Sequence, residues 1–295
     1  MTGTLKAALW MAGWLACMVV MAVAGRETTR ELNVFQVMEL RSLIGLAMLY
    51  PLIHAHGGLQ AMHTRHPWRH LGRNIAHYGA QFSWLMALTM IPLAQVISIE
   101  FTMPIWTAIL AVTFLGERMG LWKNIAVMLG LIGVAIIVRP FDGSINVGQL
   151  IALAASLGFA TSIIFVKSLT RHDKVVVILF WMMTIQSIMG LAPALYEWRT
   201  PSLYIWGWLL VIAFCGTYSH YCMTHALLHA DATVVIPMDF LRVPLAALTG
   251  WLVYAERIDL MTALGAGLIL AGNLLNLKGA TKADRKSTRL NSSHT

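Results

Sequence analysis

The sequence predicts an all-α membrane protein with ten transmembrane helices arranged as two inverted five-helix repeats. Three observations lead to this fold class: too few charged residues for a soluble surface, ten long apolar runs, and basic residues gathered on alternate loops. Of the 295 residues, 58% are hydrophobic and 12% are charged, whereas a typical soluble domain has about 25% charged residues. Apolar helices satisfy their own backbone hydrogen bonds and can therefore face lipid.

Each apolar run is long enough to cross a bilayer, because a helix needs about 20 mostly apolar residues to span the hydrocarbon core. The predicted spans are 5–24, 34–53, 72–91, 93–115, 121–138, 147–167, 175–196, 204–228, 232–254 and 259–277. Short joints separate the third run from the fourth, at residues 91–92, and the eighth from the ninth, at residues 229–231. Counts of nine or eight spans are therefore the alternatives.

The distribution of Lys and Arg favours ten spans. With the N-terminus in the cytoplasm, the cytoplasmic side carries fourteen basic residues, Arg73 among them, and the outer side carries five; Arg41 and Arg242 fall inside spans. Excess positive charge marks the cytoplasmic side. We therefore expect a multi-pass protein of a bacterial-type inner membrane with both termini in the cytoplasm. The same rule explains the net charge of +8 without nucleic-acid binding, because the basic residues are dispersed between apolar runs.

No metal or disulfide site is expected. The longest predicted cytoplasmic loop, residues 54–70, carries five histidines: His54, His56, His63, His66 and His70. Histidine-rich tracts can bind metals, but no cysteine or carboxylate accompanies these, so a solvated basic loop is the favoured interpretation. The apolar runs hold all three cysteines, Cys17, Cys215 and Cys222, and none forms a C-x-x-C pair.

The two halves of the chain resemble each other. A shift of 139 residues aligns Glu100 with Asp239 and the pair Glu117-Arg118 with Glu256-Arg257. Acids inside membrane spans are rare, so the charged matches are the informative ones.

Each half contains five spans, and an odd number means that the second copy enters the membrane from the opposite side. We therefore predict inverted repeats over residues 5–138 and 146–277, an arrangement typical of secondary transporters with a substrate site near the midplane. Residues 287–295 are polar and unlike the preceding sequence, so we expect a non-native or disordered tail there.

The end of each half carries a resemblance to a known family. In both halves a run closes with Gly/Ala-Glu-Arg, and a glycine-rich last helix follows. The matching segments are 116–118, 230–237, 242–244 and 254–257. Over about residues 5–277, the chain resembles the EamA branch of the drug/metabolite transporter superfamily. The resemblance implies ten helices, cytoplasmic termini, and transport of amino acids, nucleosides, vitamins or drug-like metabolites.

Asp239 and Arg242 lie three residues apart in the ninth run, so one helix face carries both. One interpretation is a site for a zwitterion, in which Arg242 takes a carboxylate and Asp239 takes an amine. The other is a structural ion pair. Pro237 and Pro244 flank the two residues and are expected to bend the helix there.

Glu100 has no basic residue four positions away on either side. An unpaired buried carboxyl group tends to become neutral, which predicts a proton-coupling role; the alternative is a protonated structural carboxyl group bonded to a carbonyl. Glu39 and Arg41 lie two residues apart and point to different faces of the second run. We expect structural roles for both, with Arg41 extending toward the outer interface.

Aromatic and polar side chains recur at helical spacing on three runs and predict the walls of a small-molecule cavity. The first run contributes Trp14, the third Tyr78 and Gln81, and the eighth Tyr218 and His225. For each single residue, helix packing or interfacial anchoring is the alternative. Glycines crowd the fifth and tenth runs and predict close helix contact, either within the chain or at a homodimer seam.

These features favour a secondary active transporter of small organic metabolites. The sequence has no G-x-x-x-x-G-K-[ST] loop, which disfavours an ATP-driven pump, and no H-E-x-x-H or G-x-S-x-G motif, which disfavours a membrane-embedded enzyme. No cofactor is expected. The equivalent acids Glu100 and Asp239 predict export by proton antiport. Uptake of a metabolite or vitamin is the alternative, because the same cycle serves both directions.

Overall fold

The computed structural model of the protein is a bundle of α-helices, and the described residues contain no β-strand. It describes residues 3–115, 121–138, 146–169, 171–229, 238–257 and 259–275. The helices are α1 (Gly3–Thr28), α2 (Val34–Ala55), the short η1 (Leu59–Met62), α3 (Pro67–Met90), α4 (Leu93–Glu100), α5 (Met103–Leu115), α6 (Leu121–Val138), α7 (Val147–Leu169), α8 (Val175–Tyr196), α9 (Leu203–His229) and α11 (Arg242–Tyr254). A last helix covers Leu260–Leu275.

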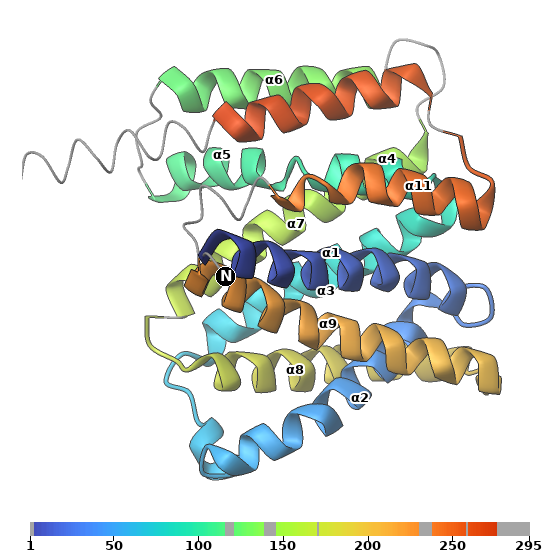
Figure 1. The fold of residues 1–295 in the computed structure, drawn as a ribbon. Helices are drawn as coiled ribbons and strands as arrows, with labels where there is room; N and C mark the ends of the chain where they lie inside the picture. Colours follow the sequence, from blue (N-terminus) through green and yellow to red (C-terminus); the bar gives the residue numbers. More distant parts are fainter. Residues whose placement is uncertain are drawn as a thin grey trace, which may run out of the picture.

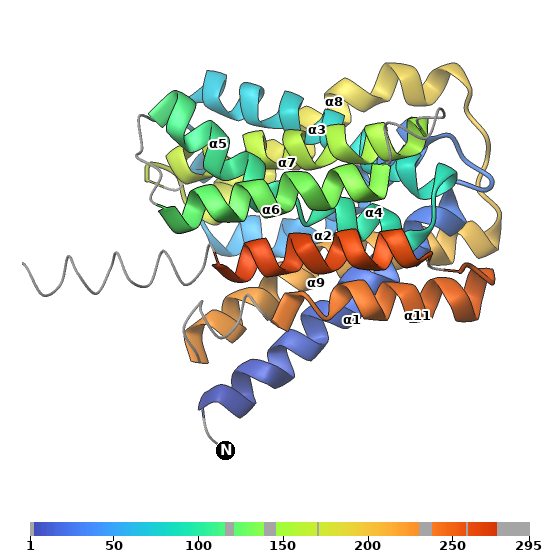
Figure 2. The ribbon, with the colours of Figure 1, turned by 90° about the horizontal axis from the view of Figure 1, so that it is seen from above.

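The helices lie roughly along one direction, and most connections between them lie at the two ends of the bundle (Figures 1 and 2). Five helical segments in the described part are long and apolar enough to cross a membrane: Leu5–Thr28, Val34–Ala55, Leu93–Leu110, Val147–Val166 and Val175–Tyr196. Shorter apolar helices cover Asn124–Val138, Leu203–Ser219 and Leu260–Leu275. The prediction of an all-helical membrane protein is thus confirmed.

Two predicted spans differ from the structure. The run 93–115 is broken, because α4 ends at Glu100 and α5 begins at Met103. The third helix begins at Pro67 rather than at residue 72; proline suits the first turn of a helix, where its missing N–H is not needed. Arg69 therefore belongs to the helix and not to the predicted loop. The segments 116–120, 230–237 and 287–295 lie outside the described residues, so the expectations for Glu117, Pro237 and the tail stay expectations.

The long helices pack in pairs. α1 lies along α9, α3 along α7, and α2 along α8, while α4 contacts α11. The main buried cluster between them draws apolar side chains from most of the helices, several each from α2, α3 and α4.

The last helix packs on α6 through glycines (Figures 1 and 2). A Cβ atom on Gly133 would lie 2.6 Å from the carbonyl oxygen of Gly265, and one on Gly272 would lie 2.8 Å from that of Ala126. These distances leave no room for side chains, so the glycines allow direct contact between the two backbones. Close helix packing within the chain is therefore the role of these three glycines in the structure.

The end of the bundle near residues 54–70 is held by hydrogen bonds to Asp173. His70 is buried, and its Nε2 lies 2.8 Å from Asp173 Oδ2, which also accepts a hydrogen bond of 2.7 Å from Thr64 Oγ1. Burial alone would raise the pKa of the Asp173 carboxyl group, but the bonds from His70 and Thr64 outweigh burial and lower it. The expectation that this whole segment is solvated is therefore wrong for His70. No group of three metal-binding side chains occurs in the described residues.

Candidate functional site

The two helix breaks bring three ionisable side chains together. In the first half, α4 ends at Glu100 and a turn at Phe101 and Thr102 precedes α5. In the second half, a turn at residues 240–241 separates Asp239 from the first residue of α11, Arg242. The freed carbonyl of Phe101 accepts a 2.9 Å hydrogen bond from Asn273 Nδ2. Breaks of this kind satisfy their backbone groups with neighbouring side chains and place ionisable residues inside the bundle.

Arg242 is held between two carboxylates. Its Nη1 donates to Glu100 Oε1 at 2.8 Å, and its Nη2 donates to Asp239 Oδ2 at 3.4 Å. The guanidinium group also stacks over the ring of Phe101, 4.7 Å from its centroid, and Arg242 is only 5% exposed. We refer to Glu100, Asp239 and Arg242 as the ionic triad.

Two tryptophans donate hydrogen bonds to the carboxylates of the triad. Trp14 Nε1 donates to Asp239 Oδ1 at 2.6 Å, and Trp84 Nε1 donates to Glu100 Oε2 at 2.9 Å. The expectation of an unpaired Glu100 is therefore wrong, because its cationic partner comes from another helix. Arg242 already has two carboxylate partners, while its Nε is a buried donor without a partner among the described residues, so its binding of a substrate carboxylate stays a prediction.

A cavity of about 500 Å³ lies beside the triad, with Glu100 in its wall. Its lining comes from α1, α2, α3, α4, α5, α7, α8 and α9. Much of the wall is apolar and includes the flexible side chains of Met18, Met21, Met103, Met182 and Met183. Methionine side chains adapt to irregular shapes, and both the size and the mixture of apolar wall and few polar groups suit a small organic ligand.

The polar part of the wall lies on α2, α3 and α7. Arg41 Nη2 donates to Gln81 Oε1 at 2.8 Å; Gln81 Nε2 lies 2.9 Å from His77 Nε2, and Ser162 Oγ lies 3.4 Å from His77 Nδ1. All four line the cavity. The expectation that Arg41 extends toward the outer interface is therefore wrong, because its guanidinium group is bonded at the cavity wall.

The structure brings most of the predicted site residues together. Trp14, Gln81 and Glu100 line the cavity. Asp239 and Arg242 contact that wall through Trp14 and Glu100.

The other predicted site residues, Tyr78, Tyr218 and His225, are not among those that line this cavity. Tyr78 is buried beside Glu39, where a Cβ atom on Gly190 would meet both side chains at 2.8 Å. Tyr218 stacks on Phe214, with ring centroids 5.2 Å apart, and His225 stacks on Trp10 at 4.7 Å. These contacts fit the packing alternative, and a substrate role for Tyr78, Tyr218 and His225 stays a prediction.

Sequence reasoning missed Arg73 and the cavity-facing role of Arg41. The signal for Arg73 was its spacing to other polar residues of α3. Arg73, His77, Gln81 and Trp84 recur every three or four residues and so share one helix face, and all four line the cavity.

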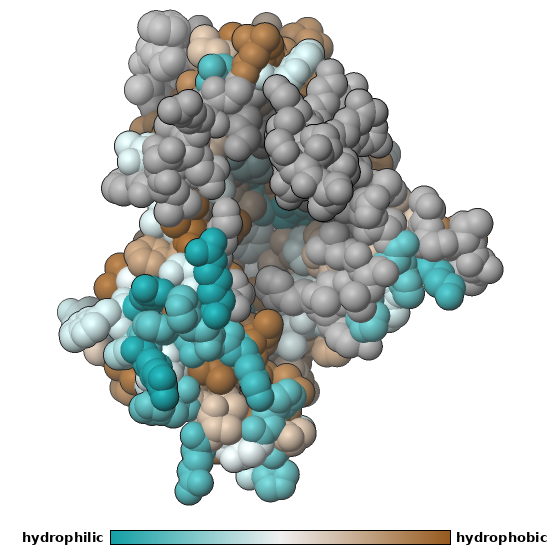
Figure 3. Space-filling model, turned by 90° about the vertical axis from the view of Figure 1, so that its left-hand side faces the viewer, coloured by the Kyte–Doolittle hydropathy of each residue, from teal (hydrophilic) through white to brown (hydrophobic). Residues whose placement is uncertain are grey.

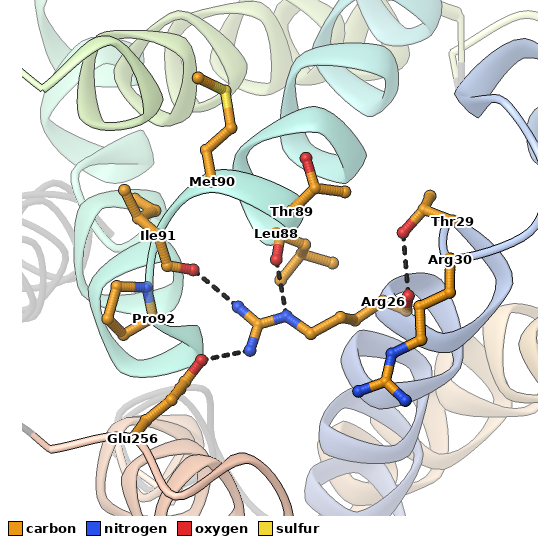
Figure 4. Close-up of a pocket in the computed structure, with 9 residues that line it drawn as sticks. All are labelled: Arg26, Thr29, Arg30, Leu88, Thr89, Met90, Ile91, Pro92 and Glu256. Carbon is orange, nitrogen blue, oxygen red and sulfur yellow. Dashed lines mark hydrogen bonds and ion pairs between the residues drawn. The ribbon is translucent and has the colours of Figure 1, made fainter.

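Arg26, near the end of α1, joins several helices at one end of the bundle and lines a pocket of about 440 Å³ there. Its Nε and Nη2 donate to the carbonyl oxygens of Leu88 and Ile91, each at 2.6 Å, and its Nη1 pairs with Glu256 (Figure 4). Glu256 also accepts a 2.9 Å hydrogen bond from the backbone N–H of Leu93 at the start of α4. Arg26 and Glu256 thus tie α1, the joint between α3 and α4, and the end of α11 together.

Glu27 extends this network of side-chain bonds around Arg26. It accepts hydrogen bonds from Tyr254 Oη at 2.8 Å and from Tyr204 Oη at 3.2 Å, and it pairs with Arg30 at 3.1 Å. Arg26 stacks over the ring of Tyr254, 4.7 Å from its centroid. The start of α9 is thereby joined to the same network.

The cavity continues toward the opposite end of the bundle. Its lining reaches Val166 near the end of α7 and Val175 at the start of α8. Figure 3 shows this end, where hydrophilic residues gather over one part of a surface that is hollowed near its centre. Exposed basic residues here include Arg65, Arg69, Arg171 and Lys174.

The sequence pattern of the EamA-like transporter family matches residues 5–139 and 146–278. Among curated relatives, the riboflavin transporter of Rhizobium johnstonii is 31% identical over 231 residues, which are 78% of this chain and 76% of that protein. The S-adenosylmethionine uptake transporter of Rickettsia felis is 26% identical over 96% of this chain and 97% of its own length. The pseudopaline exporter of Pseudomonas aeruginosa is 25% identical over 85% and 88%.

A solved structure shares the fold. A crystal structure of a protein superposes with a TM-score of 0.64 over 94% of this chain and 98% of that one, at 17% identity. At this identity the likeness concerns the fold alone.

Proposed function

The chain belongs to the EamA-like transporter family, and we propose that it is a secondary active transporter that moves small organic metabolites across the inner membrane by alternating access. The observation that carries this proposal is the 500 Å³ cavity beside the ionic triad. It approaches one end of the bundle, while the network around Arg26 and Glu256 closes the other end. Alternating access requires one site with two such ends, opened in turn.

The packing supports the inverted repeats over residues 5–138 and 146–277. If the halves are exchanged, α1 corresponds to α7 and α9 to α3, so the pair α1–α9 becomes the pair α7–α3, which also packs together. The 139-residue shift likewise converts the contact of Gly133 with Gly265 into that of Gly272 with Ala126. Two copies of one contact are what an internal two-fold axis produces.

The charge asymmetry supports cytoplasmic termini. In this orientation the exposed basic end of Figure 3 would face the cytoplasm, the cavity would approach the cytoplasm, and the Arg26 network would close the outer side. A C-terminal reporter that is active only outside the cytoplasm should stay dark; a bright reporter on intact protein would refute this orientation.

We assign substrate contact to the cavity residues Trp14 and Gln81, and substrate-linked charge changes to the triad. Two carboxylates share one guanidinium group in the triad, so one negative charge remains when both are ionised. A proton on Glu100 or Asp239, or a positive group on the substrate, would neutralise that charge. This competition supports export by proton antiport, with Glu100 as the proton carrier.

Uptake is the second candidate. The relatives named as S-adenosylmethionine uptake transporters favour it, whereas the pseudopaline exporter favours export. The cavity serves either direction, because the coupling gradient decides which way the cycle runs.

Reconstituted protein in liposomes tests the transport proposal. Radiolabelled riboflavin and S-adenosylmethionine, followed by amino acids and nucleosides, should include a solute that exchanges faster than in protein-free liposomes. Dependence on an imposed pH gradient then separates proton antiport from symport. Absence of exchange for every solute class in protein that is folded and inserted would contradict the proposal.

A further inference from the structure

The cavity wall carries positive charge that the described residues do not neutralise. Arg41 and Arg73 both line the cavity. Within the described ranges, neither has a carboxylate at ion-pair distance; the arginines that do are Arg26, Arg30 and Arg242.

Arg73 is buried with much of its hydrogen-bonding capacity unused. It is 7% exposed, its Nη1 donates to Asn74 Oδ1 at 3.0 Å, and its Nε is a buried donor with no partner in the described structure. A guanidinium group has five N–H donors, and a buried cation without a counter-charge is unfavourable. An anionic group in the cavity would supply both the charge and the acceptors.

Other acidic residues near the cavity do not pair with Arg41 or Arg73. Glu39 lies two residues before Arg41, but its Oε1 bonds to Ser187 of α8, and it does not line the cavity. Glu100 is bonded to Arg242 and Trp84. The cavity therefore has two carboxyl groups and one guanidinium group at the triad, and two guanidinium groups without a carboxylate partner on the wall of α2 and α3.

We propose that Arg41 and Arg73 bind an anionic group, a carboxylate or a phosphate, on the transported solute. Gln81 positions the Arg41 guanidinium group through the 2.8 Å bond, and His77 and Ser162 lie on the same wall. This inference rests on the proposed transport function and assigns its substrate class: an organic anion, whose positive group, if it has one, faces the triad. It revises the expected zwitterion site, because the anion partner is the Arg41–Arg73 pair and not Arg242.

Binding to purified protein tests the assignment without requiring transport. In neutral detergent at constant ionic strength, inorganic phosphate and succinate should raise the melting temperature, whereas the neutral analogue succinamide should not. Arg41→Gln and Arg73→Gln should each weaken anion binding roughly tenfold or more, the loss of one charge-assisted hydrogen bond. Arg69→Gln is the matched control, because Arg69 is exposed one turn earlier on α3 and bonds to Ser168.

The outcomes separate this inference from the transport proposal. Three outcomes would each overturn the anion site without contradicting the transport proposal. They are equal stabilisation by succinamide, no stabilisation by either anion, and unchanged anion binding in folded Arg41→Gln and Arg73→Gln. If a glutamine variant does not fold, Arg73→Lys keeps the charge and should retain measurable binding; the native protein's preference for anions decides independently. Nanodiscs of phosphatidylcholine with and without phosphatidylglycerol distinguish a solute from a lipid headgroup. Equal phosphate affinity in the two kinds of nanodisc supports binding of a solute anion. Loss of phosphate binding in the presence of phosphatidylglycerol would overturn that assignment in favour of a lipid headgroup.

Discussion

Arg242 Nη1 lies 2.8 Å from Glu100 Oε1 and so joins the start of α11 to the end of α4. The two residues are 142 positions apart, and each lies beside a helix break. A single ion pair therefore fixes both breaks relative to each other and to the cavity. Any substrate or proton that changes the charge of Glu100 also changes the force between the two halves of the chain.

Removal of Arg242 should destabilise the protein. Arg242→Gln leaves the carboxylates of Glu100 and Asp239 without their shared cation, and breaking a buried ion pair from one side costs about 3–5 kcal/mol. The double variant Arg242→Gln with Glu100→Gln should lose less than the sum of the single losses. Unfolding in mixed micelles measures these free energies. Strict additivity would show that the pair does not couple the breaks.

Asp239→Asn should reduce transport by roughly tenfold or more while the protein still folds. The amide keeps an acceptor for Trp14 and leaves Arg242 its shorter bond to Glu100, but the excess negative charge of the triad is lost. The measurement is solute exchange in liposomes alongside the melting temperature. Asp239→Glu preserves the charge and should retain partial activity; a fully active Asp239→Asn would remove Asp239 from the mechanism.

Arg26→Gln should weaken the closed end of the bundle. The arginine makes three bonds that a glutamine cannot replace, to Leu88, Ile91 and Glu256. Loss of about 1 kcal/mol corresponds to a fall of roughly 2–4 °C in melting temperature for a chain of this size class. We expect at least that fall, together with slower exchange, in differential scanning fluorimetry and liposome assays.

Arg30→Gln is the control for Arg26. Arg30 lies in the turn just after α1 and its side chain is 62% exposed, so its ion pair with Glu27 contributes little. A similar effect from both substitutions would indicate a general loss of surface charge and not a specific closure.

Much of the fold was predictable because lipid imposes simple rules. The runs 121–138 and 175–196 coincide with α6 and α8, since length and hydropathy alone define a spanning helix. The break after Glu100 was not predicted, because the sequence there stays apolar. Pro104 lies in the first turn of α5, where proline is tolerated, and the tertiary bond from Asn273 to Phe101 stabilises the interruption.

The candidate site was predictable only in part, because its contacts also join residues that are distant in the sequence. Ionisable residues within apolar spans are easy to identify in a sequence, and Glu100, Asp239 and Arg242 do lie together. Their partners do not follow from one helix: Glu100 pairs across 142 positions. Spacing also does not show which side of α9 faces the cavity; Thr217 lines it, and the adjacent Tyr218 stacks on Phe214.

Asp173→Asn should change the acid stability of the protein. Because the pKa of Asp173 is lowered in the folded state, the folded protein binds fewer protons there than the unfolded chain. Its ionised form therefore stabilises the fold above the unfolded pKa of about 3.9, and this contribution is lost as pH falls through the lower folded pKa.

Melting temperature as a function of pH checks this contribution. The native protein should lose stability on acidification below about pH 4, and Asp173→Asn should be less stable at neutral pH with a flatter profile in that range. Glu197→Gln is the control, because Glu197 is exposed at the end of α8. A native profile and an Asp173→Asn profile that run parallel would contradict the role of the His70–Asp173 pair.

Glu100→Gln should uncouple transport from the pH gradient. In the native triad, Glu100 is the carboxylate with the shorter bond to Arg242, 2.8 Å against 3.4 Å for Asp239. A proton on Glu100 would weaken that bond and release α4 from α11, so that one titration both neutralises the site and loosens the contact between the halves.

Glutamine mimics the protonated carboxyl group, and it should fix the triad in the released state. Native protein in inverted vesicles should therefore show solute flux that follows an imposed pH gradient, whereas Glu100→Gln should show only exchange that ignores it. The expected loss is the whole gradient-driven component, with exchange of solute against solute retained. Native flux that ignores the gradient would exclude proton coupling. Gradient-driven flux that survives in Glu100→Gln would assign the proton to Asp239 instead, and the same assay on Asp239→Asn would then decide.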